Sequence, residues 1–178
     1  KKKIATVWLG GCSGCHMSLL DIDERILEVA KLADIVKCPI VDGKEFPEVD
    51  VALVEGSVTS DEHWHELEHI REKSKILVAL GDCALTTNVT GMRNYTPKDD
   101  VLNYAYKDAV SNDKDGKLPN HWVLLNLHEK VVPLHEVVKV DYVINGCPPS
   151  ADTIFYVLFE LLNDRVPDLS VERKLKYG

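Results

Sequence analysis

Four cysteines carry the most informative chemistry in this sequence of 178 residues. Cys12 and Cys15 form a C-x-x-C pair, while Cys83 and Cys147 stand far along the chain. Four thiolates that converge on one point suit an iron-sulfur cluster or a zinc ion better than they suit a purely structural role. The sequence therefore predicts a metal centre, provided that the fold gathers these side chains.

The stretches before these cysteines indicate how they are gathered. Apolar runs typical of buried strands end in a glycine turn just before Cys12, Cys83 and Cys147. In open parallel sheets, ligands bind outside the carboxyl ends of the strands, where loops from several strands meet. We therefore expect these cysteines to converge at one sheet edge. Glu55 ends another apolar run and should lie at the same edge.

Strand-like and helix-like patterns alternate along the chain, which is typical of a parallel sheet with helices on both faces. Three serines stand where they could cap the first turn of a helix. The sequence thus predicts a doubly wound, three-layer α/β fold. The expected strands are Ile4–Leu9, Asp34–Val41, Val51–Glu55, Lys75–Leu80 and Asp141–Ile144, and the expected helices begin at Ser18, run from Ser60 to about Lys73, and cover Ala151–Leu162 after Ser150.

One long segment does not follow this alternation. Residues 96–136 have poor periodicity, and residues 112–116 are rich in turn-forming types. We expect a loop-rich insertion there. The sequence contains no internal repeat, linker or low-complexity tract, so residues 1–178 are predicted to form a single iron-sulfur-binding domain.

Composition narrows the classes of partner. The formal net charge is −8, from 21 basic and 29 acidic residues, which disfavours binding to nucleic acid or to an anionic membrane face. No stretch approaches the roughly 20 apolar residues that span a bilayer, so direct membrane insertion is not expected. Five cysteines are an odd number, which argues against a closed disulfide framework and favours a reducing, cytoplasmic setting.

The residues alone leave other interpretations of the cysteines open. A thiol-disulfide oxidoreductase could use Cys12 and Cys15, although it would leave Cys83 and Cys147 without a role. A zinc-binding interaction module without catalytic activity is a further alternative. Cys38 follows no glycine turn, and we expect it to be a small core hydrophobe outside the site.

A zinc metalloprotease is disfavoured, although residues 65–69 match its H-E-x-x-H pattern. At about 100° per residue, Leu67 and Ile70 share one face of the predicted helix. His65 and His69 lie on roughly the opposite face. We therefore expect both histidines to point into solvent, away from any cleft.

Several residues beside the cysteines are expected to shape the site. Glycines permit sharp turns and close approach of the main chain, and a proline after a ligand fixes the turn. A histidine beside a thiolate could donate a hydrogen bond to sulfur, although a plain surface histidine is the alternative. Glu55 could relay protons or act on a metal centre from nearby, or it could simply cap a helix or lie at the surface. The residues expected around the sulfurs are Gly11, Gly14, His16, Gly146 and Pro148.

Taken together and in this order, the motifs resemble those of one family, the small subunits of [NiFe] hydrogenases. The resemblance is strongest to the short small subunit of cytoplasmic, bidirectional, NAD-reducing members, and it spans most of the chain. The residues that carry it are Gly11–Ser18, Val54–Gly56, Gly81–Ala84, Met92–Asn94 and Gly146–Pro149.

The resemblance implies a flavodoxin-like fold that holds one proximal [4Fe-4S] cluster through Cys12, Cys15, Cys83 and Cys147. The cluster would relay electrons in a soluble hydrogen:NAD⁺ oxidoreductase, between the nickel-iron site of a large subunit and an NAD(P)-reducing diaphorase module of iron-sulfur and flavin subunits. Five cysteines cannot supply a nickel site as well.

Two further expectations follow from the same resemblance. The related subunit of NADH:quinone oxidoreductase has two adjacent cysteines where this chain has Cys12-x-x-Cys15, which argues against the alternative of a quinone-linked role. Some NAD-reducing members have been discussed as binding a second flavin on this subunit. FMN could occupy the same sheet edge, but no residue here makes a contact specific to a flavin.

Overall fold

A parallel sheet forms the centre of the protein. The structure, a computed structural model, describes residues 1–41, 43, 45–112 and 116–169. Five strands pair in the order β2-β1-β3-β5-β7, and every neighbouring pair is parallel. This is the order of flavodoxin-like doubly wound sheets. The strands are β1 (Lys2–Trp8), β2 (Ala33–Lys37), β3 (Val49–Glu55), β5 (Ser74–Leu80) and β7 (Tyr142–Ile144).

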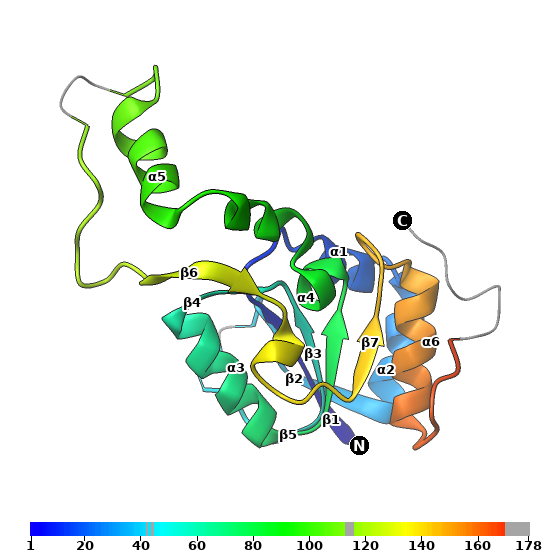
Figure 1. Cartoon of the computed structure of the whole chain (residues 1–178). Helices are drawn as coiled ribbons and strands as arrows, with labels where there is room; N and C mark the ends of the chain where they lie inside the picture. The colour runs from blue at the N-terminus through cyan, green and yellow to red at the C-terminus, as the bar shows by residue number, and fades with distance from the viewer. Residues whose placement is uncertain (42, 44, 113–115, 170–178) are drawn as a thin grey trace.

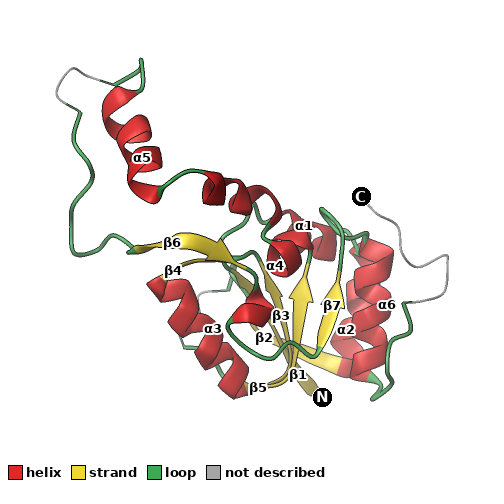
Figure 2. Ribbon diagram, in the orientation of Figure 1, coloured by secondary structure: helices red, strands yellow, loops and turns green. Residues whose placement is uncertain are grey.

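Helices cover both faces of the sheet, which confirms the predicted three-layer arrangement (Figure 2). One face carries α1 (Gly14–Leu20), α2 (Ile26–Leu32) and α6 (Ala151–Leu162). The opposite face carries α3 (Asp61–Lys73) and α4 (Asp82–Thr86). No helix in the described part of the chain is both long and apolar enough to cross a membrane.

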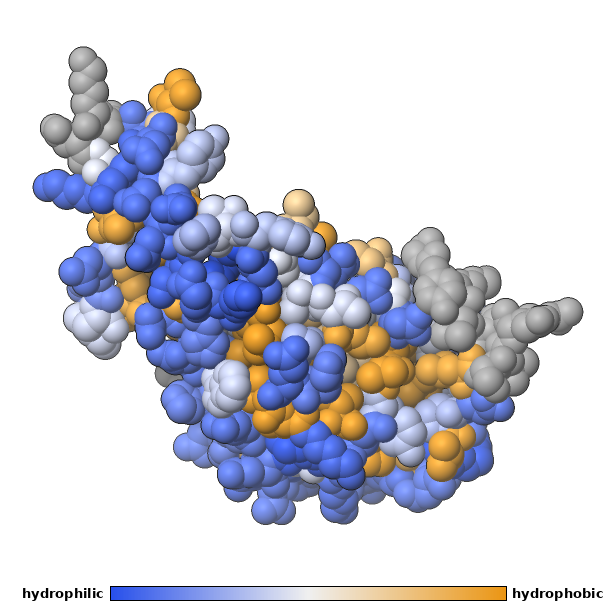
Figure 3. Space-filling view, in the orientation of Figure 1, coloured by the Kyte–Doolittle hydropathy of each residue, from blue (hydrophilic) through white to orange (hydrophobic). Residues whose placement is uncertain are grey.

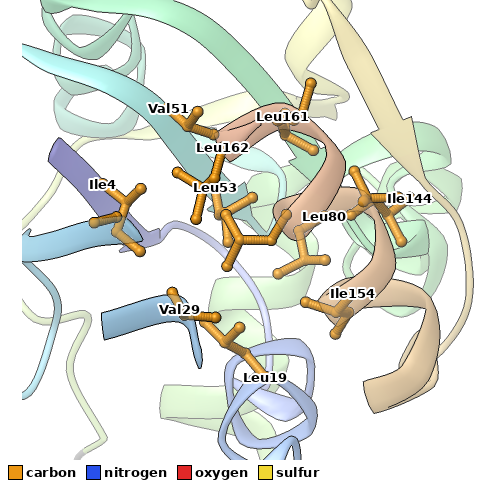
Figure 4. Packing of buried hydrophobic residues seen from close by; sticks show 14 of the residues in the cluster. Ile4, Leu19, Val29, Val51, Leu53, Leu80, Ile144, Ile154, Leu161 and Leu162 are labelled. Carbon is orange, nitrogen blue, oxygen red and sulfur yellow. The ribbon is translucent and has the colours of Figure 1, made fainter. Parts of the chain in front are cut away.

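Strand β3 shows how the sequence builds two cores at once. Val51 and Leu53 pack with α6 and α1 on one face, whereas Ala52 and Val54 pack with α3 on the other. Successive side chains of a strand point to opposite faces, so a strand that is covered on both sides is apolar throughout. Figure 4 shows the first of these cores, where Leu53 lies among side chains of β5, β7 and α6.

Two predicted helix starts are confirmed by capping hydrogen bonds. The Ser60 hydroxyl accepts from the His63 N–H at 3.3 Å, and the Ser150 hydroxyl accepts from the Thr153 N–H at 3.3 Å. The third start, at Ser18, is wrong. Helix α1 begins at Gly14, and Ser18 lies inside it, where its hydroxyl donates to the main-chain oxygen of Pro149.

The ends of the strands mostly agree with the sequence prediction, but β2 is shorter. It ends at Lys37, whereas the apolar pattern predicted a strand as far as Val41. Pro39 follows closely, and proline has no N–H to donate to a ladder. Residues 38–41 instead form a turn, in which the Val41 N–H donates to Cys38 O at 3.1 Å.

The segment between β5 and β7 is more structured than its sequence indicated. A 3₁₀ helix, η2 (Asn88–Tyr95), precedes α5 (Lys98–Asn103) and a π-helical turn (Tyr104–Asp108). The chain then returns as β6 (Leu127–Val132), which pairs antiparallel with β4 (Val58–Ser60), and a 3₁₀ turn (Leu134–Glu136) follows. Figure 1 shows this segment extending away from the sheet.

Candidate functional site

The four cysteines of the predicted site line one pocket at the carboxyl edge of the sheet. Cys12 follows β1, Cys15 stands in the first turn of α1, Cys83 stands in the first turn of α4, and Cys147 follows β7. The pocket has a volume of about 150 Å³. The structure therefore brings together all four residues. Its other lining residues are Gly11, Ser13, Gly14, Glu55, Gly56, Asp82, Gly146 and Pro148.

Main-chain hydrogen bonds join the loops that carry Cys83 and Cys147. The Asp82 N–H donates to Gly146 O at 2.9 Å, and the Gly146 N–H donates to Asp82 Oδ1 at 2.8 Å. The Gly81 N–H donates to Ile144 O at 2.7 Å, so the ends of β5 and β7 stay in register. The sequence placed Asp82 in the motif Gly81–Ala84 but gave no role for its side chain. Its position between a glycine turn and a cysteine is the only signal that could have singled it out.

Gly81 is required by the sulfur of Cys15. Its φ is +82° and its ψ is 166°, a region that only glycine adopts readily. A Cβ at this position would lie 2.2 Å from Cys15 Sγ. At Gly14 the clearance is also small, since a Cβ would lie 3.2 Å from Cys12 Sγ. These two glycines leave the space that the sulfurs occupy.

Glu55 lies at the end of β3 and is almost fully buried, with 4% of its surface exposed. Its Oε2 accepts a hydrogen bond from the His16 N–H at 2.7 Å. Burial raises the pKa of Glu55 above its ordinary value, although hydrogen bonds from His16, Cys15 and Ser13 act in the opposite direction. Glu55 is therefore a carboxyl group beside the sulfurs that holds a proton more readily than a surface glutamate.

The ring of His16 points away from the sulfur pocket. Its Nε2 lies 3.0 Å from Thr6 Oγ1, and its edge contacts the Trp8 ring. Burial lowers its pKa, so the ring favours the neutral form. His16 also lines a separate apolar pocket of about 160 Å³, which Cys38 lines as well. The ring Nδ1 is buried and has no hydrogen-bond partner among the described residues, so the structure does not show the expected hydrogen bond from this ring to a sulfur.

The free thiols of the pocket shift the pKa values of one another through electrostatic repulsion. All five cysteines are unpaired, and burial is the main cause that raises the pKa of both Cys15 and Cys83. Negative charge on the other cysteines of the pocket raises both values further. Four thiolates in one pocket repel one another, so a positively charged group is needed to keep all four ionised.

The arrangement of the sulfurs suits a group of several atoms. No set of three or more His, Cys, Asp and Glu residues in the described part of the chain is arranged to hold a single metal ion. The four cysteines instead surround a space of about 150 Å³. The donor set of four sulfurs and the size of this space fit an iron-sulfur cluster.

The H-E-x-x-H segment lies on α3 as the sequence predicted. Leu67 and Ile70 are fully buried, whereas His65 and His69 are exposed. Cys38 is partly buried and lies outside the pocket of the four sulfurs. The structure therefore separates both features from the candidate site.

Comparisons with known proteins identify the family. A family model described as the 20 kDa subunit of NADH ubiquinone oxidoreductase matches residues 12–161, which span the candidate site from Cys12 to Cys147. The chain belongs to this family. One relative, the NAD-reducing hydrogenase HoxS subunit delta of Cupriavidus necator, is 42% identical over 172 residues, which are 95% of this chain and 82% of that protein.

Two further comparisons agree with this family. The iron-sulfur subunit of the F420-non-reducing hydrogenase of Archaeoglobus profundus is 30% identical over 93% of this chain and 57% of its own length. A solved structure of NAD⁺-reducing [NiFe]-hydrogenase in the H2-reduced state matches with a TM-score of 0.96 at 38% identity, covering 100% of this chain and 99% of that chain. The family resemblance expected from the motifs is confirmed. The chain spans little more than half the length of several F420-non-reducing relatives.

Proposed function

We propose that this chain is the electron-transfer small subunit of an NAD-reducing [NiFe] hydrogenase. The observation that carries the proposal is the convergence of four cysteines, from three distant parts of the chain, on one pocket. Relatives that cover most of the chain are named as hydrogenase subunits, one of them as an iron-sulfur subunit. These names support the proposal, and the chemistry of the site is argued from its own residues.

We propose that Cys12, Cys15, Cys83 and Cys147 hold one [4Fe-4S] cluster as thiolates. Such a cluster supplies one-electron transfer when it is bound. Gly81 keeps the space of the Cys15 sulfur free, and the hydrogen bonds between Asp82 and Gly146 keep two of the ligand loops together. The protein thus contributes a preformed arrangement of sulfurs, which limits the rearrangement on electron transfer.

We propose that Glu55 holds a proton close to this site. Its Oε2 is fixed by the His16 N–H, and its burial favours the protonated form. The test is Glu55→Gln in the assembled complex, compared with Glu28→Gln on the exposed side of α2. We expect only the first variant to change turnover. Unchanged turnover together with unchanged cluster spectra would remove this role.

The proposal requires partner chains. A large subunit would carry the nickel-iron site, and a diaphorase module with flavin and iron-sulfur subunits would take the electrons. Five cysteines, four of them gathered in one pocket, leave no second set of four for nickel. Five free thiols also favour the reducing conditions of the cytoplasm.

The main test is metal analysis of the anaerobically purified protein. We expect about four iron atoms and four acid-labile sulfides per chain, with an electron paramagnetic resonance signal in the reduced protein. Serine in place of any one of the four cysteines should lower the iron content, whereas the matched control Cys38→Ser should leave it unchanged. Zinc in place of iron would support a zinc module, and a metal-free chain would support a thiol oxidoreductase.

The structure disfavours the thiol oxidoreductase. An attacking cysteine needs a lowered thiol pKa. Burial and the neighbouring negative charges raise the pKa of Cys15 instead, which makes Cys15 a poor attacking thiol. Cys12 and Cys15 also share their pocket with two more cysteines, which such an enzyme would not need.

A further inference from the structure

Cys147 is held differently from the other three cysteines of the pocket. Cys15 and Cys83 stand in the first turns of α1 and α4. Cys12 follows β1, which pairs with a neighbouring strand on each side. Cys147 instead lies within residues 146–149, outside any helix or strand, and we call these residues the Cys147 loop. The position of this sulfur therefore depends on how the loop is attached.

The strand that leads into the Cys147 loop gives it little support. Within the described residues, β7 pairs with β5 over three residues, and only Ile144 of those three is buried. Val143 is 47% exposed. Figure 3 shows apolar side chains at the surface on the side of the molecule where β7 and α6 lie. A short strand with few buried contacts opens easily, so the loop needs other attachments.

Two side chains supply these attachments, one at each end of the loop. Asp82 Oδ1 accepts from the Gly146 N–H at 2.8 Å, while the Asp82 N–H donates to Gly146 O at 2.9 Å. At the other end, the Ser18 hydroxyl donates to the main-chain oxygen of Pro149. Among the described residues, all the hydrogen bonds of the Cys147 loop go to Asp82 and Ser18.

Both side chains stand on helices that carry another cysteine of the pocket. Asp82 directly precedes Cys83 at the start of α4. Ser18 follows Cys15 by three residues on α1, and residues at this spacing are neighbours on a helix surface. Ser18 is buried, so its hydroxyl has no water to bond instead. The loop is thereby tied to the neighbours of two other sulfurs.

Asp82 also brings a carboxylate to the pocket. It lines the pocket together with Glu55, and no basic residue of the described chain does so. Burial favours the protonated form of Glu55, which reduces the negative charge from that side. A negative charge beside a redox group disfavours the addition of an electron to that group. Asp82 is therefore placed to affect both the geometry and the electrostatics of the site.

We propose that Asp82 and Ser18 are positioning residues for the Cys147 sulfur, and that the Asp82 carboxylate lowers the reduction potential of the group bound there. The inference rests on the proposed function, because it concerns the cluster that the four sulfurs hold in that proposal. Asp82 aligns one end of the Cys147 loop with Cys83. Ser18 aligns the other end with Cys15, so the fourth sulfur is set relative to two others.

The first test measures how fast a chelator removes iron from the anaerobically purified full chain. Ser18→Ala should release iron roughly fivefold faster than the wild type, because the loop loses one hydrogen bond. Asp82→Ala should release it roughly tenfold faster or more, because the lost acceptor is a carboxylate. The matched control is Ser74→Ala, which removes a buried hydroxyl that donates to Ile70 O at 2.6 Å. This control should release iron like the wild type.

The second test separates the charge of Asp82 from its hydrogen bond. Asp82→Asn keeps an oxygen that can accept from the Gly146 N–H, so it should retain iron like the wild type. Its cluster should be easier to reduce, with the ratio of reduced to oxidised form at a fixed potential roughly tenfold higher, which is about 59 mV in the midpoint potential. Glu28→Gln removes a carboxylate outside the pocket and should leave the midpoint potential unchanged.

Hydrogen exchange at the Gly146 N–H gives a readout that needs no iron. In the metal-free chain this N–H should exchange faster in Asp82→Ala and Ser18→Ala than in Ser74→Ala. Equal exchange and equal iron release in Ser18→Ala and Ser74→Ala would overturn the positioning role, and an unchanged midpoint potential in Asp82→Asn would overturn the effect of charge. A wild-type chain that binds no iron would refute the proposed function, whereas protection of the Gly146 N–H in that chain would still support the positioning role.

Discussion

Gly81→Ala is expected to damage both the stability of the chain and its metal content. The backbone at Gly81 adopts φ +82° and ψ 166°, where a residue with a Cβ is strained by roughly 1–3 kcal/mol. The new methyl group would also lie 2.2 Å from Cys15 Sγ. Relief of this overlap costs a further 1–3 kcal/mol, roughly, because the sulfur or the main chain must move.

The two costs together come to about 4 kcal/mol at the centre of their ranges. For a chain of this length, each kcal/mol lowers the midpoint of thermal unfolding by roughly 2–4 °C, so a loss of about 8–16 °C is expected. Cys15 is one of the proposed ligands, and its displacement should also reduce the iron bound per chain.

The assay combines the unfolding midpoint, followed by circular dichroism, with iron analysis of the same preparation. Gly43→Ala is the matched control, because a Cβ there has no neighbour within 4 Å. The control should unfold like the wild type and keep its iron. If Gly81→Ala matched the control in both measurements, the crowding of Gly81 against Cys15 would be refuted.

Three further predictions concern stability. Ser60→Ala and Ser150→Ala should each cost about 1 kcal/mol, measured as a lower unfolding midpoint, because each serine caps a helix. Burial acts to raise the pKa of Asp141, but hydrogen bonds from the Leu77 N–H and Arg71 outweigh it and hold that pKa below its ordinary value. The ionised carboxylate therefore stabilises the fold above about pH 4. Asp141→Asn should lower the free energy of unfolding by about 1–3 kcal/mol at pH 7, and by progressively less as the pH falls through the lowered pKa. Equal losses at pH 7 and pH 3 in denaturant titrations would contradict this. Removal of iron with a chelator should lower the unfolding midpoint, because a group that binds only the folded chain stabilises it, and an unchanged midpoint after complete removal would count against the cluster.

The central sheet could be predicted from the sequence because its strands are buried on both faces. Such strands are uniformly apolar, and the glycines that follow them mark their ends clearly. The placement of the sulfurs followed from this, since Cys12, Cys83 and Cys147 each stand just beyond a strand. The topology of a parallel sheet then brings the carboxyl ends to one edge.

The start of the first helix could not be predicted from side-chain patterns. Ser18 has the sequence context of a helix cap, but α1 begins at Gly14, and Ser13 before it adopts φ 66° without a side-chain cap. The helix begins early because the chain turns sharply at Ser13, between Cys12 after β1 and Cys15 in the first turn of α1. A tertiary requirement of the site thus overrides the local capping preference.

The segment between β5 and β7 was the least predictable part of the fold. Strand β6 pairs with the short strand β4 across a long separation in sequence, and neither strand has a core of its own. Apolar residues of this segment such as Tyr95, Trp122 and Val123 do not alternate with the period of a buried element, because the chain itself leaves them exposed. Patterns of burial predict only the elements that the chain itself covers.

Strand β7 has a consequence for how the protein is made. It contains three residues, lies at the edge of the sheet and, among the residues that the structure describes, pairs with β5 alone. The loop after β7 carries Cys147, the last of the four cysteines to be synthesised, long after Cys12 and Cys15 have left the ribosome. If the four cysteines hold a cluster as we propose, iron is retained in full only when this final strand has joined the sheet, and a loaded chain then reports that the whole sheet has folded.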